Sequence, residues 1–400
     1  MSKENLIFQP AEILLPAGDL RRWSVIACDQ FTSDGEYWAE VERFVGSAPS
    51  TLRLMLPEYY LGRVDEKAAA QKIQSTMRRY LEQGVFRAYS DSLIYVERLL
   101  SGGGIRRGLV GVIDLEAYDY APDTVSPIRA SEHTVEDRLP PRVKVRREAL
   151  LEMPHIMLFL NDPQDRTMRE ASRCAKETLY EFDLMGGGGR IRGQRISGDD
   201  AWALCAALSE GEGLHFAVGD GNHSLAAARK CWLEKKNSLP LAAQDADPAR
   251  YALVELVNIH DPAISFEPIH RVLFHTDPSD WFQAAEALSD PNGREITLLV
   301  GEEQRTICAR GNSIGELIEN TEQFCRQYLR DHGGEMDYIH GDDETRALSR
   351  GAGCCGVLLP QMEKAELFSS VEQSGPFPKK SFSIGLGPDK RYYLECRSIQ

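Results

Sequence analysis

A short polar loop, Gly219-Asp220-Gly221-Asn222-His223-Ser224, holds the residue types best suited to chemistry in this 400-residue chain. The mostly apolar residues 214–218 before it predict a strand, and residues 225–236 after it predict a helix. Backbone N–H groups at a helix N-terminus lack intrahelical partners, and the aligned peptide dipoles favour an anion there. The order of strand, glycine-bearing loop and helix therefore predicts a phosphate site.

The residues of this loop have different expected roles. Gly219 and Gly221 would let a ligand approach the backbone closely, and Ser224 is expected to cap the following helix. Asp220 could hold a metal ion or a hydroxyl group, and His223 could donate to a phosphate oxygen or transfer a proton. The alternative is an ordinary tight turn beside a capping serine. The loop has neither the Gly-Lys-Ser/Thr ending of a Walker loop nor the six-residue dinucleotide fingerprint.

A second candidate block runs from Arg129 to Arg138 and contains two arginines, three carboxylates, a histidine and two hydroxyl groups. Guanidinium groups suit bidentate binding of phosphate or carboxylate, so both arginines are candidate ligand-binding residues. Glu132 is a candidate general base or magnesium ligand. A solvated loop with local ion pairs is the alternative for this composition.

Two further segments contain arginines that could bind the same anionic ligand. The glycine run 186–189 precedes Arg190 and Arg192, so it could close over an anion or simply connect a helix to a strand. His270 and Arg271 follow an apolar strand. They could face the same cleft or be satisfied by their neighbours.

Two isolated residues complete the set of candidates. Lys380 could supply a cation to the site, although a lysine in this context is usually solvated. Asp29 begins a polar loop after the first predicted strand and is a further candidate base. The remaining histidines lack a recognisable zinc spacing.

Strand-like and helix-like segments alternate along most of the chain, which predicts an α/β fold with a mixed sheet, strand–loop–helix units and hairpins. Helices are expected at 36–42 (with Asp34 as N-cap), 65–83, 164–181, 225–236 and 315–331, and strands at 23–27, 93–97, 107–114, 155–160, 251–257, 295–300 and 355–359. Residues 1–290 are expected to form the core with the candidate site. Residues 291–400 are expected to form a smaller C-terminal α/β portion packed on that core.

The composition restricts the compartment and the partners. A net charge of −15 argues against a large phosphate-tracking surface, so we expect a small anionic ligand and no nucleic acid. The nine cysteines form no Cys-x-x-Cys pair, which indicates thiols in a reducing compartment. Without a signal-peptide pattern or an apolar run of membrane-spanning length, we expect a cytoplasmic protein with no membrane partner. The chain is compatible with a homo-oligomer.

Several short motifs, in their shared order, resemble the family called domain of unknown function 1015. The resemblance runs through nearly the whole chain and is weakest after residue 290. The motifs are 94–98, 108–111, 129–138, 154–156, 220–223, 268–271 and 380–382. The family's loop resembles the signature of the ParB-like superfamily, Asp-Gly-His-His-Arg followed by a helix, so the resemblance implies a ParB-like core.

That superfamily includes nucleotide-binding partition proteins and enzymes that phosphorylate free serine. The resemblance therefore implies a phosphotransferase or phosphohydrolase for a small hydroxylated metabolite of the serine or phosphoserine type, using a nucleotide or phosphate ligand, with Mg²⁺ expected to accompany a nucleotide. The alternatives are a ParB-like nucleotide-binding regulatory module without turnover and a scaffold with a decayed site. Asn222 and Ser224 replace a histidine and an arginine of the superfamily loop. Arg229, or one of the arginines at 129, 138, 190 and 192, would have to replace the lost guanidinium.

Overall fold

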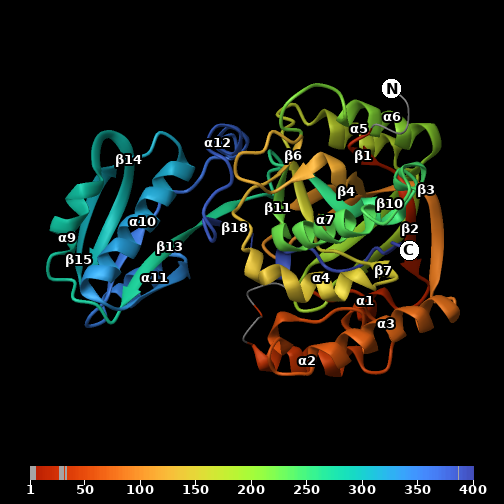
Figure 1. Cartoon of the computed structure of the whole chain (residues 1–400), viewed down its shortest axis with the longest axis horizontal. Helices are drawn as coiled ribbons and strands as arrows, with labels where there is room; N and C mark the ends of the chain where they lie inside the picture. The colour runs from red at the N-terminus through yellow and green to blue at the C-terminus, as the bar shows by residue number, and fades with distance from the viewer. Residues whose placement is uncertain (1–5, 27–30, 32–33, 386) are drawn as a thin grey trace.

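The computed structural model describes residues 6–26, 31, 34–385 and 387–400, which form two lobes of unequal size (Figure 1). Within the described residues, the large lobe is built on an eleven-stranded sheet and the small lobe on a six-stranded sheet. The large sheet contains both parallel and antiparallel pairs, and helices cover both lobes. The predicted mixed α/β fold is therefore confirmed. No helix in the described part of the chain is long and apolar enough to cross a membrane.

The candidate loop follows a strand that lies inside the large sheet and not at its edge. In spatial order its strands are β5 (Tyr118–Asp119), β6 (Ile128–Ala130), β11 (Phe216–Asp220), β8 (Met157–Leu160), β12 (Tyr251–Asn258), β4 (Ile105–Asp114), β3 (Phe86–Leu99), β10 (Arg190–Ser197) and β9 (Glu177–Asp183). In addition, β1 (Phe8–Gln9) pairs with β4, and β2 (Ala11–Pro16) pairs with β3. Because β6, β11 and β8 are neighbours, the loops that follow β6 and β11 lie close together.

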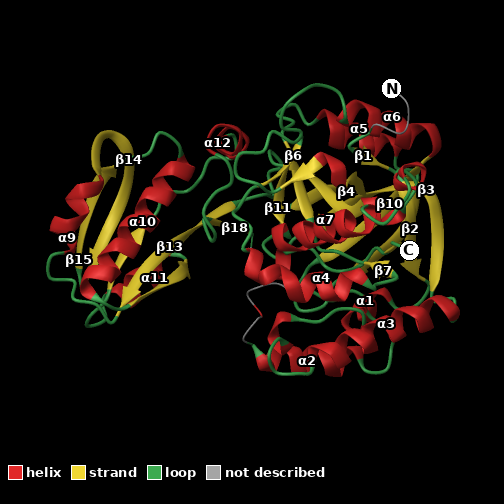
Figure 2. Ribbon diagram, in the orientation of Figure 1, coloured by secondary structure: helices red, strands yellow, loops and turns green. Residues whose placement is uncertain are grey.

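Helices pack on this sheet and form an additional layer beside it. They are α1 (Leu20–Trp23), α2 (Gly35–Val45), α3 (Glu66–Glu82), α4 (Leu139–Arg147), α5 (Arg166–Cys174), α6 (Gly198–Leu208), α7 (Asn222–Lys236) and α8 (Leu241–Gln244). The small side chains of Ala226 and Ala227 on α7 allow Leu139 and Val143 of α4 to pack closely against them. As a result α4 and α7 lie side by side over the sheet (Figure 2).

The small lobe is an antiparallel sheet covered by helices. Its strands are ordered β15 (Glu303–Ala309), β14 (Ser289–Val300), β17 (Cys355–Leu358), β13 (Phe266–Phe274) and β16 (Glu335–His340), and its helices are α9 (Trp281–Ala284), α10 (Ile314–His332) and α11 (Asp342–Ser349). Strand β13 also pairs through its first residues with β18 (Phe382–Ile384), which follows α12 (Glu366–Ser374). The chain then returns to the large lobe. There the backbones of Cys396 and Leu14 form an isolated antiparallel β-bridge, and β19 (Arg397–Ser398) pairs with β7 (Leu151–Glu152).

The structure confirms most of the predicted elements and corrects two. Asp34 caps α2 and accepts a hydrogen bond from the backbone N–H of Tyr37, as the sequence predicts. The helix expected over 164–181 ends at Cys174, because residues 177–183 pair with β10 as a strand. The strand expected over 23–27 is wrong in its described part, because Trp23 is the last residue of α1 and Val25 forms only an isolated β-bridge, with Tyr393. Ala27 lies outside the described residues.

Candidate functional site

A pocket of about 650 Å³ lies against the 219–224 loop, between the two lobes. Its lining comes from elements that are far apart along the chain: α4, the start of α7, β16 of the small lobe and the C-terminal segment. Those of the predicted site residues that line it are Glu132, Gly219, Asp220, Gly221, Asn222, His223, Ser224 and Lys380. The fold thus brings the first two candidate regions and Lys380 to one cavity.

The 219–224 loop turns sharply from β11 into α7. Gly221 is the N-cap and has a φ of 86°, in the left-handed region that glycine adopts readily. Its N–H donates to Asp220 Oδ1 at 2.8 Å. The predicted cap was wrong, because the helix begins at Asn222 and Ser224 lies within its first turn. Since the N-cap residue has no side chain, it cannot satisfy the first-turn N–H groups, which suits this end of α7 to an anion.

Packing below the loop accounts for the first glycine. A Cβ atom on Gly219 would lie 2.6 Å from the ring of Phe159, so a larger residue would disturb the buried contact between β11 and β8. Residue 219 is therefore a glycine because any side chain there would collide with Phe159. Within the loop, Asn222 is only 9% exposed, and its Oδ1 has no hydrogen-bond partner in the described part of the chain.

His223 connects the loop to the segment that carries Glu132. Its Nε2 accepts a hydrogen bond from the backbone N–H of Val135 at 3.2 Å. This nitrogen is therefore unprotonated, and a neutral His223 has its proton on Nδ1. One residue before Glu132, the buried hydroxyl of Ser131 donates to the Val218 carbonyl of β11. These two contacts fix Glu132 beside the loop.

The carboxyl group of Glu132 lines the pocket and has a raised pKa. Burial raises its pKa to about 7, and the nearby Asp220 acts in the same direction. The Ser381 N–H, which donates to Glu132 Oε1 at 3.3 Å, and the charges of Lys380 and Lys390 oppose this rise. A carboxyl group with a pKa near 7 can exchange a proton at neutral pH, as a general base must.

Several residues that line the pocket were not among the predicted site residues. Lys390 places its Nζ 3.4 Å from Asp220 Oδ2. Tyr393 and His155 also line the pocket, with the Tyr393 hydroxyl and His155 Nδ1 2.7 Å apart. Arg142 of α4 also lines the cavity. The basic residues of 142–147 and the 154–156 motif were the available signals, and nothing local to Lys390 distinguishes it from a surface lysine.

Four predicted residues lie outside the pocket and have partners of their own, and two of them, Arg190 and Arg192, are on β10. Arg190 pairs with Glu181 and Asp183 of β9. Arg192, also on β10, pairs with Glu97 of β3. Neither arginine is among the described residues that line the pocket. Cross-strand neighbours therefore account for both charges.

The two β13 candidates have structural partners in the small lobe. Buried His270 contacts Asp342 through Nε2 at 2.9 Å and accepts from the Leu359 N–H through Nδ1, while burial lowers its pKa. Buried Arg271 pairs with Glu322 at 2.9 Å. Neither residue is among the described pocket-lining residues.

Three other candidates have more limited descriptions. Arg129 Nε donates to the Ser126 carbonyl at 2.8 Å, which holds its own loop. Arg138 ends the short helix η6 (Glu136–Arg138), and only its backbone is described. Asp29 lies outside the described residues.

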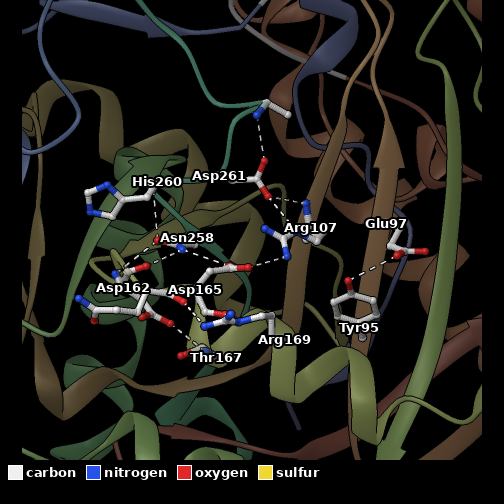
Figure 3. Close-up of polar contacts among 12 residues, drawn as sticks. Tyr95, Glu97, Arg107, Asp162, Asp165, Thr167, Arg169, Asn258, His260 and Asp261 are labelled. Carbon is white, nitrogen blue, oxygen red and sulfur yellow. Dashed lines mark hydrogen bonds and ion pairs between the residues drawn. The ribbon is translucent and has the colours of Figure 1, made fainter.

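A separate polar network lies where β8 and β12 end (Figure 3). Arg107 contacts Asp165 at 2.8 Å and Asp261 at 3.3 Å, and Asn258 Nδ2 donates to the Asp162 carbonyl at 2.8 Å. These ion pairs tie Asp165 and Asp261, which follow β8 and β12, to Arg107 of β4. Among the described residues, no group of three or more His, Cys, Asp or Glu side chains could hold a metal ion alone.

Comparison with solved structures finds distant similarities. SbnI with a C-terminal truncation, from Staphylococcus aureus, has a TM-score of 0.37 and 10% identity, covering 69% of this chain and 82% of that one. A free serine kinase in complex with AMP has a TM-score of 0.38 and 11% identity, covering 71% and 90%. A conserved hypothetical protein from Pyrococcus furiosus has a TM-score of 0.37 and 11% identity, covering 71% and 93%.

No curated protein matches the chain. A family model described as "Protein of unknown function (DUF1015)" matches residues 8–346, which is most of the sequence. The matched region includes the 129–138 block and the 219–224 loop, whereas Lys380 and Lys390 lie beyond it. The chain belongs to the DUF1015 family.

Proposed function

We propose that this protein is a phosphotransferase or phosphohydrolase for a small hydroxylated metabolite of the serine or phosphoserine type, with a nucleotide or phosphate ligand. The observation that carries the proposal is one pocket holding a carboxyl group with a pKa of about 7, an uncapped helix N-terminus and lysine side chains. A base and an anion site in the same cavity are what phosphoryl transfer to a hydroxyl group requires.

In the transfer reaction, Glu132 accepts the proton of the substrate hydroxyl group. The hydroxyl oxygen forms a bond to the terminal phosphorus of the nucleotide, and the bond from that phosphorus to the bridging oxygen breaks. The nucleotide leaves with one phosphate fewer, and the proton stays on Glu132 until solvent removes it. The first-turn N–H groups of α7 and the lysines bind the phosphate oxygens, which is the larger part of catalysis in this reaction class.

The oxygen donors in the pocket fit a magnesium ion that arrives with phosphate. Mg²⁺ is usually held by one or two carboxylates together with substrate phosphates and water, and not by a complete protein cage. With Glu132 acting as the base, Asp220 supplies a carboxylate for the ion, and the unpartnered Oδ1 of Asn222 supplies a further oxygen. When bound, the ion would neutralise phosphate charge.

Part of the pocket lining is apolar and suits the base of a nucleotide. These side chains come from the layer of α2 and α3 and from the segment between them, and include Trp38, Leu54, Met55, Leu56 and Met77. Ligand sites commonly combine an apolar wall with a few polar groups that fix orientation. A cavity of about 650 Å³ has the volume expected for a small-molecule site.

The second candidate is a ParB-like nucleotide-binding regulatory module without turnover. Two observations favour it: Nε2 of His223 is occupied by a backbone hydrogen bond, and Asp220 is paired with Lys390. Among the candidate bases that the structure describes, Glu132 would then remain. The two candidates share the anion site and differ in whether Glu132 transfers a proton.

Thermal unfolding with and without Mg²⁺, in the presence of ATP, ADP, CTP, pyrophosphate, serine or phosphoserine, tests the binding step. A native-state ligand raises the midpoint by mass action. Turnover of each stabilising ligand would then be compared between wild type, Glu132→Gln and Glu97→Gln, a carboxylate outside the pocket. The enzyme proposal expects Glu132→Gln to bind and not turn over, with the control unaffected. Binding without wild-type turnover would favour the regulatory module, and no binding would refute both.

A further inference from the structure

The C-terminal segment carries a lysine to the lining of the pocket. Lys390 follows the short helix η9 (Gly387–Asp389), and its side chain is only 11% exposed. Its Nζ lies 3.4 Å from Asp220 Oδ2, and its charge also acts on the carboxyl group of Glu132. A cation placed so far from solvent is costly unless anionic groups surround it.

The backbone around Lys390 is held by two buried arginines from the large sheet. Arg98 donates through Nη1 to the Lys390 carbonyl at 2.9 Å and through Nη2 to the Pro388 carbonyl at 2.6 Å. Arg106 Nη1 donates to the Asp389 carbonyl at 2.7 Å. The two arginines are 1% and 3% exposed, so these are hydrogen bonds inside the protein.

The neighbouring residue adds a third anchor. The Asp389 carboxylate accepts from both the N–H and the hydroxyl group of Ser101, each at 2.9 Å. Three successive residues, 388–390, are therefore fixed through groups other than the lysine ammonium. Because the segment is anchored without that ammonium, a function at the tip of the side chain explains its position better than a structural tie does.

We propose that Lys390 binds the phosphate group of the ligand, and that Arg98 and Arg106 are positioning residues which hold it over the 219–224 loop. Without ligand, Asp220 balances the ammonium. When a phosphate-bearing molecule such as a nucleotide or pyrophosphate enters, its oxygens share that ammonium with the first-turn N–H groups of α7. The inference rests on the proposed function, and it extends the site beyond the region that the family model matches.

Calorimetric titration of the full-length protein with pyrophosphate and with ADP, each with and without Mg²⁺, tests this role. Lys390→Met removes the charge and keeps the stem, Lys390→Arg keeps the charge, and Lys235→Met is the control. Lys235 pairs with Asp247 at 2.8 Å near the far end of α7. Loss of a charge-assisted hydrogen bond should weaken binding to Lys390→Met by about tenfold or more. Lys390→Arg should recover most of the affinity, and the control should bind like wild type.

A second variant tests the same role in case Lys390→Met does not fold. Asp220→Asn removes the charge that balances the ammonium, so pyrophosphate should bind this variant more tightly than wild type when Mg²⁺ is absent. Suppose that wild type binds the ligand. Unchanged affinity in Lys390→Met, or weaker metal-free binding in Asp220→Asn, would then overturn the role of Lys390 and leave the proposed function standing. If wild type binds neither ligand, the proposed function fails together with this inference.

Discussion

Glu132 should make the protein less stable as the pH rises through neutrality. Its pKa is raised from 4.5 to about 7 in the folded protein. Between these values the native state binds more protons at this group than the unfolded state does. The free energy of unfolding therefore falls with increasing pH across this window. The shift sets an upper limit of roughly 3 kcal/mol on the loss, since one pKa unit corresponds to about 1.4 kcal/mol.

Glu132→Gln removes this ionisation and should remove its contribution to the pH dependence. Urea unfolding of wild type and Glu132→Gln at several pH values from 5 to 8 would measure the difference. The variant should gain stability relative to wild type as the pH rises, by up to about 3 kcal/mol above neutrality. Glu97→Gln is the matched control and should show no such trend. A difference between Glu132→Gln and wild type that stays constant with pH would refute the account of Glu132.

Three further outcomes follow from the geometry of the loop and the sheet. Gly221→Ala forces a side chain into a φ of 86° and places its Cβ 3.1 Å from Ile156, so urea unfolding should show a loss of about 1–2 kcal/mol. His223→Ala leaves the Val135 N–H without its acceptor; we expect a loss of roughly 1–3 kcal/mol and a smaller ligand-induced rise in the unfolding midpoint. Arg192→Gln should bind pyrophosphate like wild type in a calorimetric titration, and weakened binding would contradict its placement outside the pocket.

Local patterns were sufficient to predict the loop and many of the elements. The apolar run before Gly219 and the helical run after Ser224 are both continuous in sequence, so β11 and α7 could be expected. The cap could not be assigned in the same way, because Gly221 and Ser224 are both common near helix starts. Only the backbone conformation at Gly221 distinguishes the two possibilities.

The remainder of the site depends on contacts between distant segments. Arg190 and Arg192 look free in the sequence, yet pairing of β10 with β9 and β3 places carboxylates beside them. Lys390 is the opposite case, because no local motif marks it in the sequence and yet it lines the pocket. Hydrogen bonds from Arg98 and Arg106 to the backbone of residues 389 and 390 hold it there. Strand register and the return of the C-terminus decide these positions, and neither can be obtained from residue spacing.

The most direct test of the proposed activity is phosphorus NMR of wild-type protein incubated with ATP, Mg²⁺ and serine, beside Glu132→Gln. The account predicts that wild type forms phosphoserine and ADP, and that Glu132→Gln binds ATP with little or no product. If wild type binds ATP and forms no phosphorylated product with serine or other small hydroxylated metabolites, the transferase account is contradicted and the regulatory module is favoured.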